Sequence, residues 1–440
     1  MFVALDDTDS REGMCTTFLL TEIIRRSGLD VIGFPQLVRL NPAIEYKTRG
    51  NGALAVNLAK GKGAQTVIGK LDGREIRSYQ EVLEEPSVDA LMELSRDAVM
   101  ELSELGSPDT NPGIVISGHR FPRELYRESV QGEVSIDHAE NFIIENGGIF
   151  LKVKSGRGII GAAAAISWPM LSTTYELLVY RYPKPDRMEA SLKESIARRC
   201  ESIPGTFNNF DPHNRYAAIF PRERTPVVFG IRGVEYEPIL GAVPELLKSL
   251  PMAHDRYLIF STNQGSDDHI IHNPEKFTEN CSYEATGHVE GLPRNIEGSH
   301  YFVGFRTDAG TIDLAAFEPT KEFRELFRDL KPDDELRVFG TYRRGTLNVE
   351  KMEVMSVSQI FVRSSPVCES CGNLMESRGH MDYRCRNCRR KEALPRYRLQ
   401  ERALVPGKYD VPVIARRHIS RPYELEKVAW KAGILNRVPL

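Results

Sequence analysis

The 440-residue chain has no apolar run long enough for a membrane-spanning helix, which takes roughly 20 residues. The longest run, residues 159–168, ends at Pro169. The amino terminus also lacks the basic segment and cleavage site of a secretory leader, because apolar residues begin at Phe2. These absences argue against membrane and secreted classes, and we expect a cytoplasmic protein.

Cysteine is scarce and unevenly placed. Of seven cysteines, Cys15, Cys200 and Cys281 are isolated, and the other four form one cluster near the carboxyl end. This distribution favours a reducing compartment and a metal site over disulfides. With 41% hydrophobic and 27% charged residues, the composition is that of a globular protein. The length predicts about two to four domains.

The usual phosphate-binding motifs are missing or incomplete. Residues 63–71 have the wrong glycine spacing for a P-loop and lack its terminal Ser or Thr. Residues 156–161 carry the glycine pattern of a dinucleotide loop, but no clear strand precedes them and no acidic residue occupies the expected setting. A close approach of backbone to backbone, or of backbone to a phosphate, is therefore favoured there over a Rossmann site.

An acidic loop follows the first apolar run. Residues 2–5 predict a buried strand, and Asp6, Asp7 and Asp9 follow it directly. Cys15, Thr16 and Thr17 come next, and a helical pattern then begins, with Leu19, Leu20, Ile23 and Ile24 on one face. Carboxylates at a strand end, facing a helix amino terminus, are suited to a cation that holds phosphates. The alternatives are an acidic turn that only solvates the strand end and, for Thr16, a hydroxyl that caps the helix.

Two further interpretations of the amino-terminal region stay open. Asp7 and Asp9 nearly fit the Asp-x-Asp-x-Thr pattern of aspartyl phosphatases, although Arg11 occupies the hydroxyl position. Residues 45–52 form a basic, glycine-containing loop that is suited either to cradle phosphates or to serve as an exposed hairpin turn.

The second half of the chain predicts two more folding units. Alternating helix and strand patterns over residues 187–260 indicate a compact α+β domain of ferredoxin-like type. From Tyr283 the pattern becomes all-β. Five period-two segments recur, with a helix-like insert at 322–329 between the third and the fourth; the segments are 288–290, 301–306, 311–316, 335–342 and 347–354. This order predicts an OB-fold.

A zinc site is the strongest local signal. Two Cys-x-x-Cys pairs, Cys368 with Cys371 and Cys385 with Cys388, are separated by thirteen residues. Four thiolates at this spacing close a tetrahedral cage, so the Zn²⁺ would be structural and without an open position.

The carboxyl-terminal part is basic, with 17 Lys/Arg against 8 Asp/Glu over residues 363–440. Arginines alternate with tyrosines here, a pattern that fits phosphate contact and base stacking. We predict RNA or single-stranded DNA binding by five arginines: Arg386, Arg389, Arg390, Arg416 and Arg417.

These motifs resemble a known family. The run from Asp6 to Ser10, followed by residues 13–17, is similar to the opening of archaeal tRNA(Ile) 2-agmatinylcytidine synthetases. The resemblance spans nearly the whole chain and includes the four cysteines and the segments 39–42, 46–52, 110–113, 156–158, 180–183, 230–233, 262–263, 317–321 and 415–418. Residues 60–109 differ from the family pattern, and the chain continues past Arg421 with a helix-like tail at 424–432.

The resemblance implies a multidomain α+β ligase. Such an enzyme replaces the 2-carbonyl oxygen of the wobble cytidine of an isoleucine tRNA with agmatine, after ATP-dependent phosphorylation of that oxygen, and releases AMP and phosphate. It implies an α/β kinase-like domain, a ferredoxin-like domain, an OB-fold and a zinc ribbon. We place these at 1–183, 184–280, 281–362 and 363–400, with a basic extension over 401–440.

The resemblance also implies roles for residues. Asp6, Asp7 and Asp9 match the family's Mg²⁺-and-ATP aspartates, and Thr16 matches its autophosphorylated threonine. We assign the following to ATP binding: Lys47, Arg49, Gly50, Asn51, Gly156, Arg157 and Gly158. The rival hypotheses are a single-stranded nucleic-acid binding protein and a Mg²⁺-dependent phosphatase or nuclease.

Overall fold

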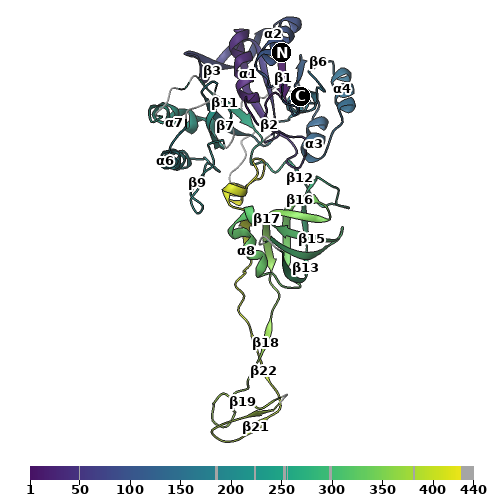
Figure 1. Ribbon diagram of the computed structural model, residues 1–440, viewed down its shortest axis with the longest axis vertical. Coiled ribbons are helices and arrows are strands. Elements are labelled where there is room, and N and C mark those ends of the chain that lie inside the picture. Colours follow the sequence, from purple (N-terminus) through teal and green to yellow (C-terminus); the bar gives the residue numbers. More distant parts are fainter. Residues whose placement is uncertain are drawn as a thin grey trace.

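The computed structural model describes residues 1–48, 50–183, 187–221, 224–250, 254, 256–296, 300–379 and 382–427. Arg49, assigned above to ATP binding, lies outside the described residues. The molecule is elongated: an α/β part occupies one end, a β-barrel the middle, and a small ribbon the far end of a slender stalk (Figure 1). The described chain holds no helix with the length and apolar character that crossing a membrane requires.

One mixed sheet of nine strands organises the α/β part, in the order β10-β7-β11-β2-β4-β3-β1-β5-β6. Its strands are β1 (Phe2–Asp6), β2 (Asp30–Arg39), β3 (Gly52–Leu71), β4 (Arg74–Glu84), β5 (Gly113–Ser117), β6 (Ile149–Lys152), β7 (Thr174–Tyr180), β10 (Val227–Gly233) and β11 (Arg256–Thr262). Strand β7 pairs with both β10 and β11. The domain boundary expected after residue 183 therefore falls within a continuous sheet.

Helices cover both faces of this sheet (Figure 1). Successive side chains of β1 point to opposite faces and therefore enter two different cores. Val3 and Leu5 pack with α1 (Thr16–Ser27), α2 (Val88–Leu102), α6 (Ala190–Glu201) and α7 (Tyr236–Lys248). Ala4 packs on the opposite face with α3 (Glu124–Gln131), α4 (Ile136–Glu145) and α5 (Gly158–Ser167). Strand β1 pairs with β3 on one side and with β5 on the other. Two neighbouring strands and two helix layers therefore surround it.

The middle part is a closed barrel of five strands, as the period-two pattern predicted. Its strands are β13 (Ser282–Ile296), β14 (His300–Thr307), β15 (Gly310–Ala316), β16 (Glu335–Arg343) and β17 (Thr346–Ser356). Strand β13 pairs with both β14 and β16, which closes the ring. Helix α8 (Glu322–Arg328) lies between the third and fourth strands and packs Phe323 and Phe327 into the barrel core.

A two-stranded stalk carries the ribbon away from the barrel (Figure 1). It consists of β18 (Phe361–Ser364) paired with β22 (Arg396–Leu399). The ribbon itself contains β19 (Glu376–Ser377), β20 (Tyr383–Arg384) and β21 (Lys391–Glu392). Its buried core consists of little more than Met375, Tyr383 and cysteines. Such a core is too small to fold this segment alone, so a metal staple is required.

After the stalk, the chain turns back toward the sheet. Strand β23 (Gly407–Asp410) pairs with β17 of the barrel, and the 3-10 helices η2 (Val413–Ala415) and η3 (Tyr423–Lys427) follow. We call residues 411–421, which run between the barrel and the sheet, the return segment. Of the helix predicted at 424–432, the first residues form η3, and those after Lys427 lie outside the described residues.

Regular structure is slight between α6 and β10, where β8 (Phe210–Asp211) pairs with β9 (Tyr216–Ala217). The β3–β4 hairpin and helix α3 were not predicted. The hairpin pairs Lys60 with Glu84 and Leu71 with Arg74, and its mostly polar, two-sided exposure leaves no apolar alternation to detect.

Candidate active site

A cavity of about 760 Å³ opens beside the carboxyl end of β1. The residues that line it come from the acidic loop, the end of β2, the loop at 44–52, residues 129–134, the start of α5, strands β7 and β10, residues 208–225 and the return segment. The predicted residues brought together here are Asp6, Asp7, Asp9, Thr16, Lys47, Gly50, Asn51, Arg157, Gly158, Arg416 and Arg417. Gly156 is not in the lining; its φ of +66° makes the turn that leads into α5.

The acidic loop is held in a constrained conformation. Asp7 has a φ of +58°, a left-handed value that is uncommon for a non-glycine residue. Its amide donates to Asp6 Oδ1 at 2.7 Å, and its Oδ2 accepts from Arg157 Nη2 at 3.0 Å. The hydroxyl of Thr110 donates to the carbonyl oxygen of Asp9 at 2.7 Å. The loop is thus tied to α5 and to the chain before β5.

The carboxyl groups of this loop are unlike those of a solvated turn. Burial, together with the charge of Asp7, raises the pKa of Asp6 to about 8. Burial also raises the pKa of Asp7, although Arg157 opposes the shift. Adjacent carboxylates at a cavity floor are destabilised unless a proton or a cation neutralises them. The loop therefore lines a cavity and is held by contacts with Arg157 and Thr110, and its role as a phosphate and cation site stays a prediction.

Among the described residues, Asp6, Asp7 and Asp9 do not form a preformed three-carboxylate metal site. In the described chain, ligand atoms of three or more His, Cys, Asp or Glu residues converge within 4.8 Å at the four cysteines, and Asp6, Asp7 and Asp9 do not form such a group. Shared binding of one Mg²⁺ by all three aspartates stays a prediction and would need a side chain to move.

Thr16 lies at the first position of α1 with 5% of its surface exposed. Its Oγ1 accepts a hydrogen bond from the hydroxyl of Thr8 at 3.1 Å. The N-cap is Cys15, whose side chain makes no capping hydrogen bond. The helix-capping alternative for Thr16 is therefore wrong, and its hydroxyl stands in the cavity wall beside the acidic loop.

Two glycines of α5 allow the backbone approach that the sequence pattern favoured at 156–161. A Cβ on Gly158 would lie 2.4 Å from both the carbonyl oxygen of Asp6 and the amide nitrogen of Gly113. A Cβ on Gly161 would collide with the Asp6 carboxylate. Strand β6 precedes this segment, contrary to expectation, but it is a short edge strand.

The loop at 44–52 forms one rim of the cavity. Lys47 Nζ donates to the carbonyl oxygen of Pro42, and burial with the charges of Arg417 and Arg343 lowers the pKa of Lys47 to about 8. Asn51 Nδ2 donates to the carbonyl oxygen of Asn41 at 2.8 Å. The Arg157 guanidinium lies 5.4 Å from the Tyr46 ring. The loop joins the antiparallel strands β2 and β3 and exposes Tyr46, and these contacts place it at the cavity rim, so its role in holding phosphates stays a prediction.

A buried charge cluster in the cavity wall was not predicted. Glu176, 2% exposed on β7, accepts from Arg232 Nε at 3.2 Å and lies 3.5 Å from Arg39 Nη2. Gln264 also donates to Glu176, and its Oε1 lies 3.1 Å from His418 Nδ1. The available signal was a charged residue inside an otherwise apolar strand, as at Glu176 and Arg232.

The predicted basic residues do not form one surface. Arg386, Arg389 and Arg390 lie in the ribbon, where Arg386 pairs with Glu376 and Arg390 with Glu369. By contrast, Arg416 and Arg417 belong to the return segment and line the cavity. Arg416 donates to Asn208 and Arg417 to Thr341. A tRNA contact by either arginine group stays a prediction.

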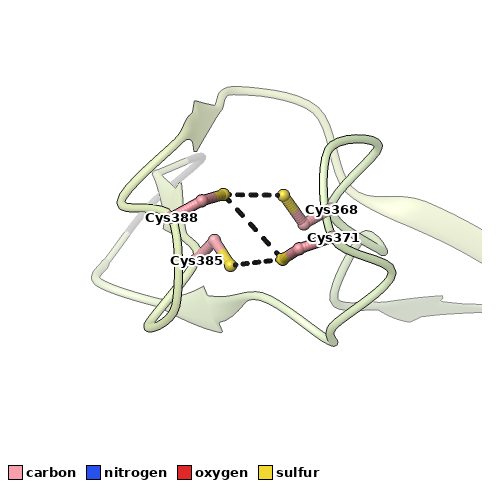
Figure 2. A group of neighbouring side chains, drawn as sticks. All are labelled: Cys368, Cys371, Cys385 and Cys388. Atoms are coloured by element: carbon pink, nitrogen blue, oxygen red, sulfur yellow. Dashed lines mark hydrogen bonds between the residues drawn. The ribbon is translucent and has the colours of Figure 1, made fainter.

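The four cysteines of the ribbon point toward one another (Figure 2). The Sγ atoms of Cys368 and Cys388 are 3.2 Å apart, and those of Cys371 lie 3.4 Å from Cys385 and 3.9 Å from Cys388. Tetrahedral Zn²⁺ with bonds of about 2.3 Å places sulfurs about 3.8 Å apart, so the residues fit this ion. Each knuckle closes alike: the Gly372 amide donates to the Cys368 carbonyl, and the Arg389 amide to the Cys385 carbonyl.

Family models match most of the chain. The TiaS TCKD domain matches residues 2–155, the TiaS FLD domain 156–269, and the TiaS C-terminal zinc ribbon domain 365–404. The isoleucine-tRNA 2-agmatinylcytidine synthetase TiaS of Thermoplasma volcanium is 47% identical over 428 residues, covering 97% of this chain and 98% of that protein. The chain belongs to the TiaS family. Its Archaeoglobus fulgidus member is 36% identical over 434 residues, covering 96% of each chain.

Solved TiaS structures share the whole architecture. Apo TiaS superposes with a TM-score of 0.83 at 34% identity, and the complex of TiaS with its isoleucine tRNA and ATP with 0.81 at 33%. The complex of TiaS with that tRNA, AMPCPP and agmatine gives 0.79 at 31% identity. Each comparison covers 98% of both chains. Those TiaS proteins therefore bind tRNA, an ATP analogue and agmatine on this architecture.

Proposed function

We propose that this TiaS-family chain conjugates agmatine to position 2 of the wobble cytidine of an isoleucine tRNA. The reaction consumes ATP, phosphorylates the cytosine carbonyl oxygen and releases AMP and phosphate. The observation that carries the proposal is the cavity, which brings together the acidic loop, Thr16 and several Lys and Arg side chains. It lies in a chain that matches TiaS over nearly its full length. The sheet part then supplies a kinase-like unit and a ferredoxin-like unit, and the barrel and ribbon supply the tRNA grip.

The residues around the acidic loop divide the work on ATP. Arg157 and Lys47 both line the cavity and offer positive charge to phosphate oxygens. Mg²⁺ held by Asp6, Asp7 or Asp9 supplies charge neutralisation at the triphosphate when bound. Arg157 already pairs with Asp7, so it orients that carboxylate and remains beside the phosphates. We assign the role of phosphoryl acceptor within the protein to Thr16 Oγ1.

Burial serves the second half of the reaction. Once the cytosine carbonyl oxygen is phosphorylated it is a good leaving group, and water could then attack the carbon that bears it. The site must therefore exclude water until the amine arrives. The wobble base must leave its stack to enter the cavity, which needs a hold on the tRNA elsewhere. The stalk and ribbon extend far from the cavity and are suited to provide this hold (Figure 1).

The test is incubation of the protein with an isoleucine tRNA transcript, ATP and agmatine, followed by nucleoside mass spectrometry. We expect a cytidine nucleoside whose mass increases by agmatine minus water. Release of free phosphate or cleaved RNA without agmatine would instead favour a phosphatase or nuclease. Retention of tRNA with no product of any kind would favour a simple binding protein.

A further inference from the structure

The return segment brings the barrel into contact with the cavity wall. Its residues Arg416, Arg417 and His418 line the cavity, while Ser420, two positions later, is buried against the barrel. The segment is hydrogen-bonded to the loop after β11 by main-chain groups. Gly265 N donates to His418 O at 2.9 Å, and Asp267 N donates to Ile419 O at 3.0 Å.

One barrel carboxylate holds this junction. Glu350, on β17, is 7% exposed and contacts three side chains from outside the barrel. Its Oε1 is 2.9 Å from Nε2 of the fully buried His269, and its Oε2 accepts from Ser420 Oγ at 2.8 Å. Arg417 Nε lies 3.7 Å from the same Oε2. Burial alone would raise the pKa of Glu350, but His269 and Arg417 hold it below its usual value.

The next barrel residue makes a second clamp. Lys351 pairs with Asp267 and donates to the carbonyl oxygen of Arg421 at 3.0 Å. Asp267 in turn accepts from the Arg421 amide at 2.7 Å. Consecutive residues of β17 thus fix both the loop after β11 and the end of the return segment.

On the cavity side, the same segment continues into the buried charge cluster. His418 is hydrogen-bonded to Gln264, and Gln264 donates to Glu176. Glu176 in turn accepts from Arg39 and Arg232. A displacement of Ser420 would therefore move His418 and Arg417, because they lie only two and three positions before it along the chain.

We propose that Glu350 is a positioning residue for the transfer reaction. From the barrel, it fixes Ser420 and Arg417 against His269, and so holds residues 416–418 in the cavity wall. The expected effect on the transfer rate rests on the proposed function. The expected effect on the placement of residues 416–418 rests on the contacts alone. It assigns the barrel a part in arranging the active site besides any part in binding tRNA.

Glu350→Gln keeps the size of the side chain and removes its charge. We expect the single-turnover rate of agmatine transfer at saturating substrates to fall about tenfold or more, since the charge-assisted contact that places the cavity residues is weakened. The dissociation constant for tRNA should stay within about threefold. Hydrogen exchange of residues 411–421 should accelerate in the protein without substrates.

The matched control is Asp334→Asn. Asp334, directly before β16 of the barrel, is another buried carboxylate and pairs with Arg402 at 2.7 Å, but its partners lie within the barrel and the segments beside it. We expect this variant to lower the melting temperature without changing the transfer rate of the folded protein or the exchange of 411–421. Equal rate losses in the two variants at equal stability would overturn the inference.

Ser420→Ala tests the same contact more gently, since it removes one hydroxyl. We expect a rate loss of about threefold, and less than additive losses when it is combined with Glu350→Gln, because both changes weaken the same contact between Ser420 and residue 350. Fully additive losses, or unchanged exchange of 411–421 in Glu350→Gln, would overturn the inference. Wild-type protein that forms no agmatine conjugate would refute the proposed function instead, while the exchange result still decides the role of Glu350.

Discussion

At the residue scale, Asp6 is a carboxyl group that the fold holds in an unfavourable place. Its folded pKa of about 8 lies above the ordinary value of 3.8, so the folded state binds more protons than the unfolded state between these values. Stability contributed by this group is therefore lost as the pH rises toward 8. We expect Asp6→Asn to melt at a higher temperature than the wild type at pH 8, with the difference shrinking toward pH 5.

The measurement is a series of thermal melts without divalent cations, and Asp97→Asn, an exposed change on α2, is the control that should follow the wild type. Added Mg²⁺ should raise the melting temperature of the wild type more than that of Asp6→Asn, because a ligand stabilises the state that binds it. Parallel pH curves for wild type and Asp6→Asn would show that Asp6 titrates normally.

Thr16 gives a second test at this scale. Its hydroxyl does not cap α1, and it contacts Thr8 within the cavity wall, so its removal should cost little stability. We expect Thr16→Ala to abolish transfer and any phosphate carried by the protein, with tRNA affinity within a few-fold of wild type. Thr17→Ala, which removes a neighbouring hydroxyl that contacts Cys15, should still acquire phosphate. Intact-protein mass spectrometry after incubation with ATP distinguishes the two.

At the element scale, the fit of α5 against β1 fixes the acidic loop. We expect Gly158→Ala to destabilise the protein by roughly 1–3 kcal/mol, because its Cβ would overlap the backbone of Asp6 and Gly113. Binding of ATP should weaken as Asp6 and Asp7 shift. Gly118→Ala is the control, since a Cβ there meets nothing within 4 Å. Thermal melts and nucleotide titration check both; full ATP affinity in Gly158→Ala would contradict the packing argument.

The elements that could be predicted are those whose pattern is local in the sequence. The barrel strands alternate apolar and polar residues, and the acidic loop and the cysteine pairs are contiguous motifs, so all three were found. The wall around Glu176 was not, because its contacts join residues 137 and 154 positions apart, as in Arg39–Glu176 and Gln264–His418. The position of the return segment was not predicted for the same reason. Its arginines were interpreted as part of a basic tail, whereas the fold places them in the cavity wall.

At the scale of the whole molecule, the ribbon should act on tRNA binding and leave the sheet intact. Its cysteines form the centre of the small buried cluster of that segment, and its two-stranded stalk separates it from the barrel. We expect zinc chelation to unfold the ribbon and weaken tRNA binding while the main melting transition persists.

The salt dependence of tRNA binding identifies the cause of that weakening. Each phosphate that the folded ribbon neutralises contributes about 1 to the slope of log affinity against log salt, so the slope should fall by that amount per phosphate when the ribbon unfolds. Cys388→Ser should reproduce the effect of the chelator, whereas Cys281→Ser, outside the cluster, should not. Titrations at several salt concentrations, with proteolysis of residues 365–404 as the reporter of folding, make the measurement. An unchanged slope after the ribbon unfolds would place the phosphate contacts on the barrel and the cavity rim, and would remove Arg386, Arg389 and Arg390 from the predicted interface.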